Sequence, residues 1–263
     1  MRHAVAVARY TVADLLRSRW MLGYAGFFAA ISWALFYFGE EPAQAIVSLL
    51  SLVLLIIPLV SAVFALTQCY HSREFVELLL AQPLDRGSVF FGQYVGLAGT
   101  LALAFVLGVA SPFLWYAWYE GGELAPLLGL LAAGVLLTFI FAAIAFLIST
   151  LTENRLRALG AVIFLWLYFT VLYDGLLLIF IMLFDVYPLE RPLIALTMLN
   201  PVDLARILIL LRLDVAALMG YTGAVFERFF GSGVGTALSV GALLVWTAVP
   251  VLIAARCYRR RDF

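Results

Sequence analysis

The sequence contains no lysine, and all 16 of its basic side chains are arginines. A Walker-type nucleotide site needs a lysine on the β- and γ-phosphates, and a protein kinase also needs its own lysine. The chain is therefore predicted to be neither kind of enzyme. If its function uses ATP, the ATP and Mg²⁺ must be bound by a partner subunit.

Histidine and cysteine are nearly as scarce. The only histidines are His3 and His71, and the only cysteines are Cys69 and Cys257. These are too few for a zinc site with histidine ligands, for haem held by paired histidines, or for a Ser–His dyad within the membrane. We predict no catalytic residue, no metal site and no resident cofactor, and we expect both cysteines to be free thiols.

Charge of either sign is also sparse. Charged residues make up 12% of the chain, compared with about 25% in soluble domains. Hydrophobic residues make up 65%, compared with about 45–50%. A water-soluble fold cannot absorb this apolar excess, because its surface must be wetted. The composition excludes a soluble enzyme, a disordered chain and a nucleic-acid binder. It predicts a single membrane domain that covers residues 1–263.

Six stretches are long and apolar enough to cross the hydrocarbon as helices. The runs are continuous and do not alternate every second residue, so they predict an all-α fold and not a barrel. Pro58 can kink the second span, and the third is long enough to tilt or to break near Ser111-Pro112. The predicted spans are Trp20–Phe38, Ala45–Cys69, Val89–Tyr119, Leu127–Leu151, Ala158–Phe184 and Thr236–Arg256.

The arginines are distributed unevenly between the two sides of these spans. Twelve lie on the side of the N-terminus, and only Arg191, Arg206, Arg212 and Arg228 lie on the other. Positive residues accumulate in cytoplasmic loops. The pattern predicts a multi-pass protein of the bacterial inner membrane with both termini in the cytoplasm.

The first 19 residues resemble an amphipathic helix that lies in the membrane interface. The alternative is a solvated N-terminal tail. In the interfacial model, Val5, Val12, Leu15 and Leu16 share one face, while Arg2, Arg9, Asp14 and Arg17 stay in contact with water.

Two longer segments separate the spans. On the cytoplasmic side, residues 70–88 predict a short helix over 72–82 that Pro83 ends, followed by a turn at Asp85 and Gly87. A short amphipathic helix at this surface suits docking into a groove of a soluble partner. A simple connecting loop is the alternative.

On the outer side, residues 185–235 exceed what a connection needs. Asn200-Pro201 predicts a turn before a helix over Val202–Leu213, with a further helix over Leu218–Phe230. We expect a hairpin of short helices over the outer face, which either binds a partner or only caps the bundle. Asp203 can cap the first helix and lies three residues before Arg206. The expected apolar face consists of Leu204, Ile207, Leu208 and Leu211.

Asp174 is the one ionisable residue predicted at membrane depth. A charge there is costly, so we expect it to face the bundle interior or to be protonated, with Tyr168, Tyr173 or a tryptophan as donor. A helix-packing hydrogen bond with no role in transport is the alternative. Separately, Gly92 and Gly96, followed by Gly99, permit a close approach of another helix to the third span.

The stretch from Glu77 to Gly87, with the sequence ELLLAQPLDRG, resembles the coupling-helix region of ABC-2 type permeases. The residues just upstream, Ser72–Phe75, depart from the Glu-x-Gly-Thr pattern that is frequent in that family. The resemblance implies an ABC-transporter permease that couples to a separate cytoplasmic ATPase. The implied coupling residues are Arg73, Glu74, Glu77, Leu80, Gln82, Pro83, Asp85 and Arg86.

Two further stretches narrow this resemblance. Residues 164–174, ending in Asp174, and residues 199–206 are similar to segments of the permeases that serve nitrous oxide reductase maturation. This implies two permease copies, a dimer of the ATPase that binds ATP and Mg²⁺, and a periplasmic β-helical protein. The assembly would serve the copper–sulfide centres of that reductase. We expect the outer partner to contact Asn200, Pro201, Asp203, Arg206 and Leu208.

Two other functions stay open at this stage. A general ABC-2 exporter of a drug, lipid or ion would share the core but need no outer partner. A membrane anchor for a redox complex would need cofactor ligands in its spans, which the two surface histidines do not supply.

Overall fold

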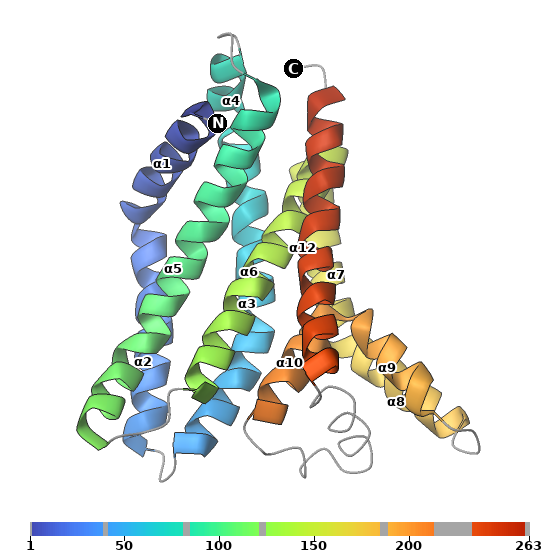
Figure 1. Cartoon of the computed structure of the whole chain (residues 1–263). Helices are drawn as coiled ribbons and strands as arrows, with labels where there is room; N and C mark the ends of the chain where they lie inside the picture. Colours follow the sequence, from blue (N-terminus) through green and yellow to red (C-terminus); the bar gives the residue numbers. More distant parts are fainter. Residues whose placement is uncertain are drawn as a thin grey trace.

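The computed structural model describes residues 2–38, 42–80, 85–120, 125–184, 189–212 and 233–260. Within these ranges every regular element is helical, which confirms the all-α prediction (Figure 1). The helices are α1 (Arg2–Leu16), α2 (Arg19–Phe38), α3 (Pro42–His71), α4 (Arg73–Leu80), α5 (Arg86–Glu120), α6 (Ala125–Leu151), α7 (Arg155–Leu167), the π-helical turn η1 (Tyr168–Leu172), α8 (Tyr173–Leu183), α9 (Glu190–Met198), α10 (Pro201–Arg212) and α12 (Gly233–Arg260).

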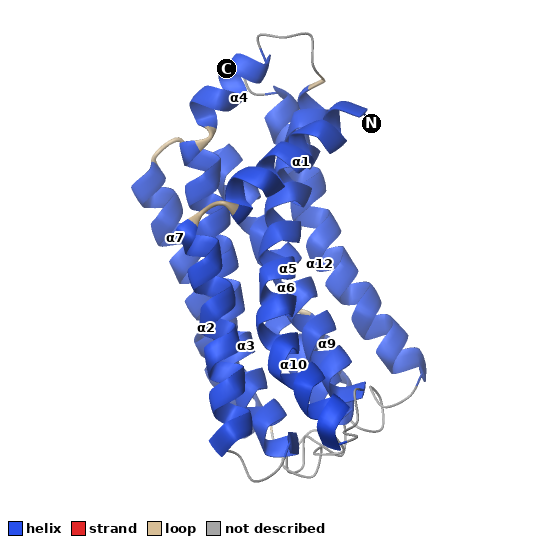
Figure 2. Ribbon diagram, turned by 90° about the vertical axis from the view of Figure 1, so that its left-hand side faces the viewer, coloured by secondary structure: helices blue, strands red, loops and turns tan. Residues whose placement is uncertain are grey.

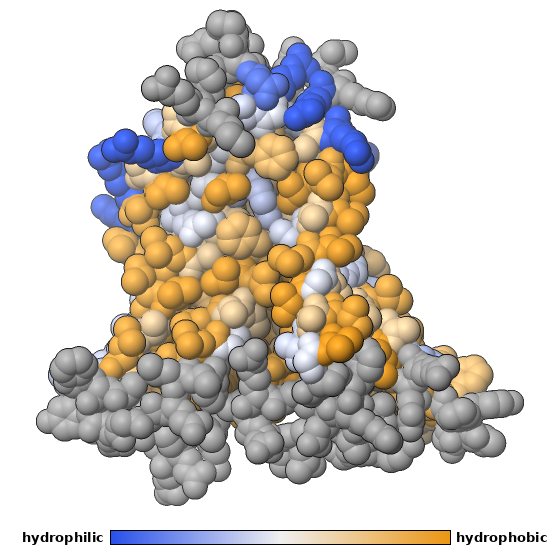
Figure 3. Space-filling model, in the orientation of Figure 1, coloured by the Kyte–Doolittle hydropathy of each residue, from blue (hydrophilic) through white to orange (hydrophobic). Residues whose placement is uncertain are grey.

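Six helical stretches of the described chain are long and apolar enough to span a membrane, as predicted. They run between two ends of a bundle (Figure 2). Both termini and α4 lie at one end, called the α4 end below, and α9 lies towards the other, the α9 end (Figure 1). Hydrophilic residues gather at the α4 end, above a broad hydrophobic band (Figure 3). The cytoplasmic location of the termini stays a prediction.

Helix α6 forms the centre of the bundle. It packs against α3, α5, α12 and α10. Its middle is almost wholly buried and includes a run of small residues, with Ala142, Ala143 and Ala145 fully inaccessible. Small side chains let neighbouring helices approach closely, which is how membrane helices gain packing energy where lipid is as apolar as the core.

Helix α5 runs without a break through Pro112, which excludes the break near Ser111-Pro112 and leaves tilting as the predicted alternative. Proline has no N–H, and the carbonyl of Gly108, four residues earlier, loses its helical partner. The Ser111 hydroxyl donates to that carbonyl at 3.1 Å. The neighbouring side chain thus compensates for the proline, and the helix continues.

Helix α1 packs along α5, and the two glycines singled out from the sequence explain how. An added Cβ at Gly92 would lie 2.7 Å from the Ala4 carbonyl oxygen, and one at Gly96 would lie 2.9 Å from that of Ala8. Close helix approach is confirmed at both positions. An added Cβ at Gly99 would meet nothing within 4 Å, so Gly99 takes no part in this contact.

Helix α1 buries one side against the rest of the chain. Val7 and Leu15 are buried, whereas Val5 is 68% exposed and Leu16 is 45% exposed. Leu15 therefore packs within the chain, and the membrane-facing side predicted for Val5, Val12 and Leu16 stays a prediction. The location of α1 in the membrane interface stays a prediction.

The fifth span and the outer segment depart most from the predicted layout. The fifth span is the least buried of the six. Its backbone hydrogen bonding changes from α-helical to π-helical at η1. After this turn α8 leaves the bundle axis, and α9 returns beside α8 (Figure 1). Helices α9 and α10 meet at an angle of 110° and are together apolar enough to enter a membrane.

Helix α10 packs against α6, α12 and α3, and Val202, Leu204 and Ala205 are fully buried. Helices α9 and α10 thus form the expected pair of short helices, and α10 packs against the bundle. This bent pair is called the elbow below. The expected helix over Leu218–Phe230 lies outside the described residues.

The close contact between α1 and α5 yields a matched pair of variants. Gly96→Leu should lower the free energy of unfolding by about 1–3 kcal/mol, the usual cost of overpacking. Gly99→Leu should have little effect, because its Cβ position is open. Thermal unfolding of the detergent-solubilised chain measures both. Equal midpoints for the two variants would contradict the packing that we describe.

Candidate functional site

The first candidate site is α4 with the residues around it. Val76 is buried against the bundle, while Leu78 is 70% exposed. Glu74, Glu77 and Leu80 lie in α4, but the structure does not describe their side chains, and Gln82 and Pro83 lie outside the described residues. The presence of a short helix is confirmed, and its contact with an ATPase stays a prediction.

Three contacts hold the junction between the end of α3 and the start of α4 against the bundle. The Tyr70 hydroxyl donates to the Thr152 carbonyl at the end of α6 (2.5 Å). The Arg73 guanidinium lies 4.3 Å from the centre of the Tyr70 ring, a cation–π distance. The Gln93 amide of α5 donates to the Ser72 hydroxyl at 3.4 Å. Side chains therefore join the segment around the start of α4 to α5 and to the end of α6.

Asp85 and Arg86 lie where α5 begins. The Asp85 carboxylate caps the helix by accepting from the Ser88 N–H at 2.9 Å and from the Ser88 hydroxyl at 3.2 Å. The hydrogen bond from the Ser88 N–H holds the pKa of this exposed carboxyl below its ordinary value. Arg86 donates to the Arg259 carbonyl at 3.4 Å and so joins the start of α5 to the end of α12.

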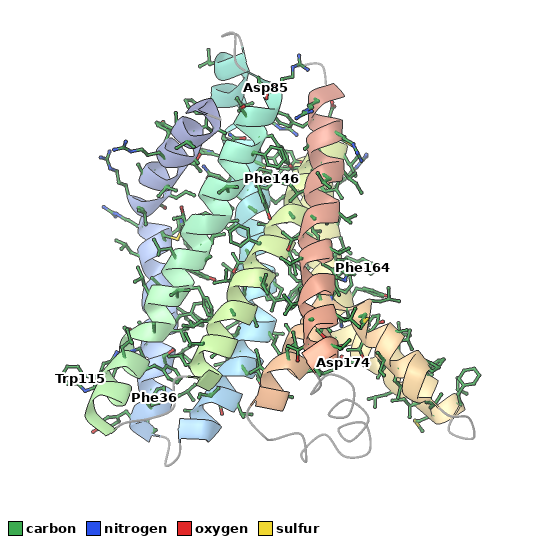
Figure 4. The ribbon with its side chains drawn as sticks, in the orientation of Figure 1. Phe36, Asp85, Trp115, Phe146, Phe164 and Asp174 are labelled. Carbon is green, nitrogen blue, oxygen red and sulfur yellow. The ribbon has the colours of Figure 1, made fainter. Side chains whose placement is uncertain are left out.

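The second candidate site is a cluster of charged groups towards the α9 end, far from Asp85 (Figure 4). Arg206 of α10 forms an ion pair with Asp174 of α8 at 2.9 Å and one with Asp203 at 3.2 Å. The predicted tyrosine or tryptophan donor to Asp174 is wrong, because Arg206 takes that place. The predicted contact between Asp203 and Arg206, which lie three residues apart, is confirmed.

Two carboxylates share one arginine in this cluster, which leaves one excess negative charge when both are ionised. Asp203 is buried, and Arg206 and Asp174 are about one third exposed (32% and 38%). The Oδ2 atom of Asp203 accepts from the Asn200 amide at 2.8 Å. A charge in an apolar environment persists only when it is paired or hydrogen-bonded. Arg206 therefore holds the elbow and the fifth span together.

Asn200 is buried at the elbow, where it replaces missing backbone bonds. In η1 the Tyr173 N–H bonds to the Tyr168 carbonyl, five residues back. An α-helix would have used the Phe169 carbonyl, which accepts instead from the Asn200 amide at 2.8 Å. The Asn200 side-chain oxygen accepts from the Val202 N–H at 3.0 Å and caps α10. The cap predicted for Asp203 therefore belongs to Asn200.

Side-chain donors also bond to backbone carbonyls in the last turn of α9. The Tyr173 hydroxyl donates to the Leu196 carbonyl at 2.6 Å, and the Trp246 indole N–H donates to the Met198 carbonyl at 3.2 Å. The last carbonyls of a helix have no partner within it. Here the fifth and sixth spans supply the donors. The sequence showed aromatic residues at these positions but no signal for their partners.

The five predicted outer contact residues thus fall into two groups. Asn200, Pro201 and Asp203 are buried in this single chain. Arg206 and Leu208 are partly exposed. In the described part of the chain, no three His, Cys, Asp or Glu side chains come together where they could hold a metal ion.

The shared arginine leads to an asymmetric prediction. Arg206→Gln should lower the free energy of unfolding by about 3 kcal/mol, because it leaves two carboxylates without a counter-charge. Asp174→Asn should cost about 1 kcal/mol, because Arg206 keeps Asp203. The double variant should be more stable than Arg206→Gln alone. Unfolding in mixed micelles measures all three, and equal costs for the single variants would exclude a shared arginine.

Comparison with known proteins agrees with this arrangement. Residues 52–263 match the family model described as ABC-2 family transporter protein. The chain is 31% identical over 271 residues to the probable ABC transporter permease protein NosY of Pseudomonas aeruginosa, with 97% of each chain covered. It is 29% identical over 283 residues to the protein of the same name from Stutzerimonas stutzeri, again with 97% of each covered. The chain therefore belongs to the ABC-2 family of transporter permeases, as a multi-span membrane subunit similar to NosY.

Proposed function

We propose that this permease subunit serves the maturation of nitrous oxide reductase, where it couples ATP hydrolysis by a separate cytoplasmic ATPase to work across the inner membrane. The observation that carries the proposal is similarity to two NosY permeases over 97% of the chain. The work is transport or the transmission of force for assembly of the copper–sulfide centres.

The proposed assembly contains two copies of this chain and a dimer of a NosF-like ATPase at the α4 end. With the α4 end in the cytoplasm, the excess of arginine on that side satisfies the positive-inside rule. A NosD-like periplasmic β-helical protein docks at the α9 end. In this arrangement ATP and Mg²⁺ belong to the ATPase, because this chain has no lysine for a Walker site.

Helix α4 is the proposed contact with the ATPase. It is short, it lies at the end of the bundle, and its exposed Leu78 and Phe75 offer an apolar surface. An amphipathic helix of this kind binds in an apolar groove. Its attachment through Tyr70 and Gln93 allows movement of the ATPase to reach α5 and α6.

The α4 proposal is tested by combining Glu77→Arg with Leu80→Asp. We expect the purified permease to lose its ATPase, because the charge of one contact residue is reversed and the apolar contact of the other is removed. Its folded yield should stay unchanged. The matched control is Leu156→Asp, which places the same charge on an exposed leucine outside α4. Full co-purification and normal stimulation of the ATPase by the α4 variant would exclude this contact.

The outer docking proposal needs a variant that spares the buried elbow. Shortening the chain between Leu213 and Phe226, or introducing a charge with Leu208→Asp, should abolish capture of the periplasmic protein while the ATPase is retained. Asn200→Leu is the contrasting variant and should lower the folded yield, because it removes the internal bonds at the elbow. Pull-down from solubilised membranes is the readout. Well-folded shortened variants that still capture the periplasmic protein would refute docking here.

A further inference from the structure

Two adjoining cavities lie inside the α4 end of the bundle. One has a volume of about 230 Å³ between α1, α3, α4, α5 and α6, and the other has a volume of about 40 Å³. Cys69, Gln93 and Phe146 line both. Phe146 lies in the half of the bundle nearer to Asp85 (Figure 4). The cavities have room for a group of several heavy atoms as well as ordered water.

Arg73 contributes a positive charge to the smaller cavity. Its Nη2 atom is buried without a hydrogen-bond partner, and its guanidinium lies over the Tyr70 ring. No carboxylate among the described side chains forms an ion pair with it. A guanidinium withdrawn from water is stable only when a negative charge or a set of acceptors compensates for the lost hydration.

The other polar groups of the smaller cavity are neutral and leave this positive charge without a counter-charge. They are Cys69, Gln93, Ser149, Thr150 and Tyr258. The Ser149 and Thr150 hydroxyls donate to carbonyls of their own helix. The one acid that lines the larger cavity is Asp14, which is exposed. The described lining of the smaller cavity therefore carries a formal charge of +1.

We propose that these cavities bind a small oxyanion, with Arg73 as the charged ligand and Gln93 and Ser72 as polar ligands. The planar guanidinium matches the paired oxygens of a sulfate or phosphate group. Bound there, the anion joins the first residue of α4 to α5. It therefore holds α4 in one position against the bundle. The site uses only this chain's residues and does not depend on the proposed nitrous oxide reductase function.

Cys69 supplies a direct readout, because its thiol lines both cavities. The test uses the full-length permease with Cys257→Ser, so that Cys69 is the sole thiol. Sulfate or phosphate at ten times its Kd should slow alkylation by N-ethylmaleimide about tenfold, in proportion to occupancy. Chloride at equal ionic strength should not slow it. Absence of protection by both oxyanions would overturn the proposal.

Arg73→Gln should abolish this protection, and Arg155→Gln should keep it. Arg155 is an exposed arginine that does not line the cavities, so it is the matched control for loss of one positive charge. Equal protection in both variants would remove Arg73 from the site. If Arg73→Gln does not fold, equilibrium dialysis of the parent chain with labelled sulfate replaces it, and the absence of saturable binding refutes the site.

A phospholipid headgroup carries the same phosphate chemistry as the free anion. The alkylation is therefore repeated in detergent with and without added phosphatidylglycerol. Protection by sulfate or phosphate in the absence of this lipid identifies a free anion. Protection by the lipid alone overturns the free-anion site and assigns the cavities to a headgroup. No ATPase is present, so the result is independent of the α4 coupling proposal.

Discussion

The hydrocarbon of a membrane offers no hydrogen-bond partner, so each break in a helix must be closed by the protein itself. The Ser111 hydroxyl replaces the bond lost at Pro112, and Asn200 bonds the carbonyl that the π-helical turn leaves free. Tyr173 and Trp246 close the last turn of α9. In the described part of the chain, each of these three irregular places thus lies beside a side-chain donor.

This constraint shapes the α9 end. Asp174 and Arg206 belong to segments that are separated by more than thirty residues, and each alone would be costly at this depth. Together with Asp203 they form one cluster that joins the fifth span to the elbow. The two short sequence segments that suggested a narrower family resemblance are therefore in contact, as parts of one structural site.

The α4 end and the α9 end are connected through α6. Tyr70 bonds to Thr152 just after α6 ends, and α6 packs against both α3 and α10. In the proposed function, this permease receives displacement from the ATPase at the α4 end and delivers it at the α9 end. A central helix with small, fully buried residues suits this task, because close packing transmits movement with little deformation.

The sequence by itself determined the all-helical class, the six spans, the short helix after the second span and the close approach at Gly92 and Gly96. These follow from hydrophobic run length and residue size, which act locally. Only the tertiary structure decided that Arg206 is the partner of Asp174, that α10 packs against the bundle, and that Arg73 lines an internal cavity. Each depends on which distant segment lies beside a polar group in a medium without water, and periodicity along one helix carries no information about its neighbour.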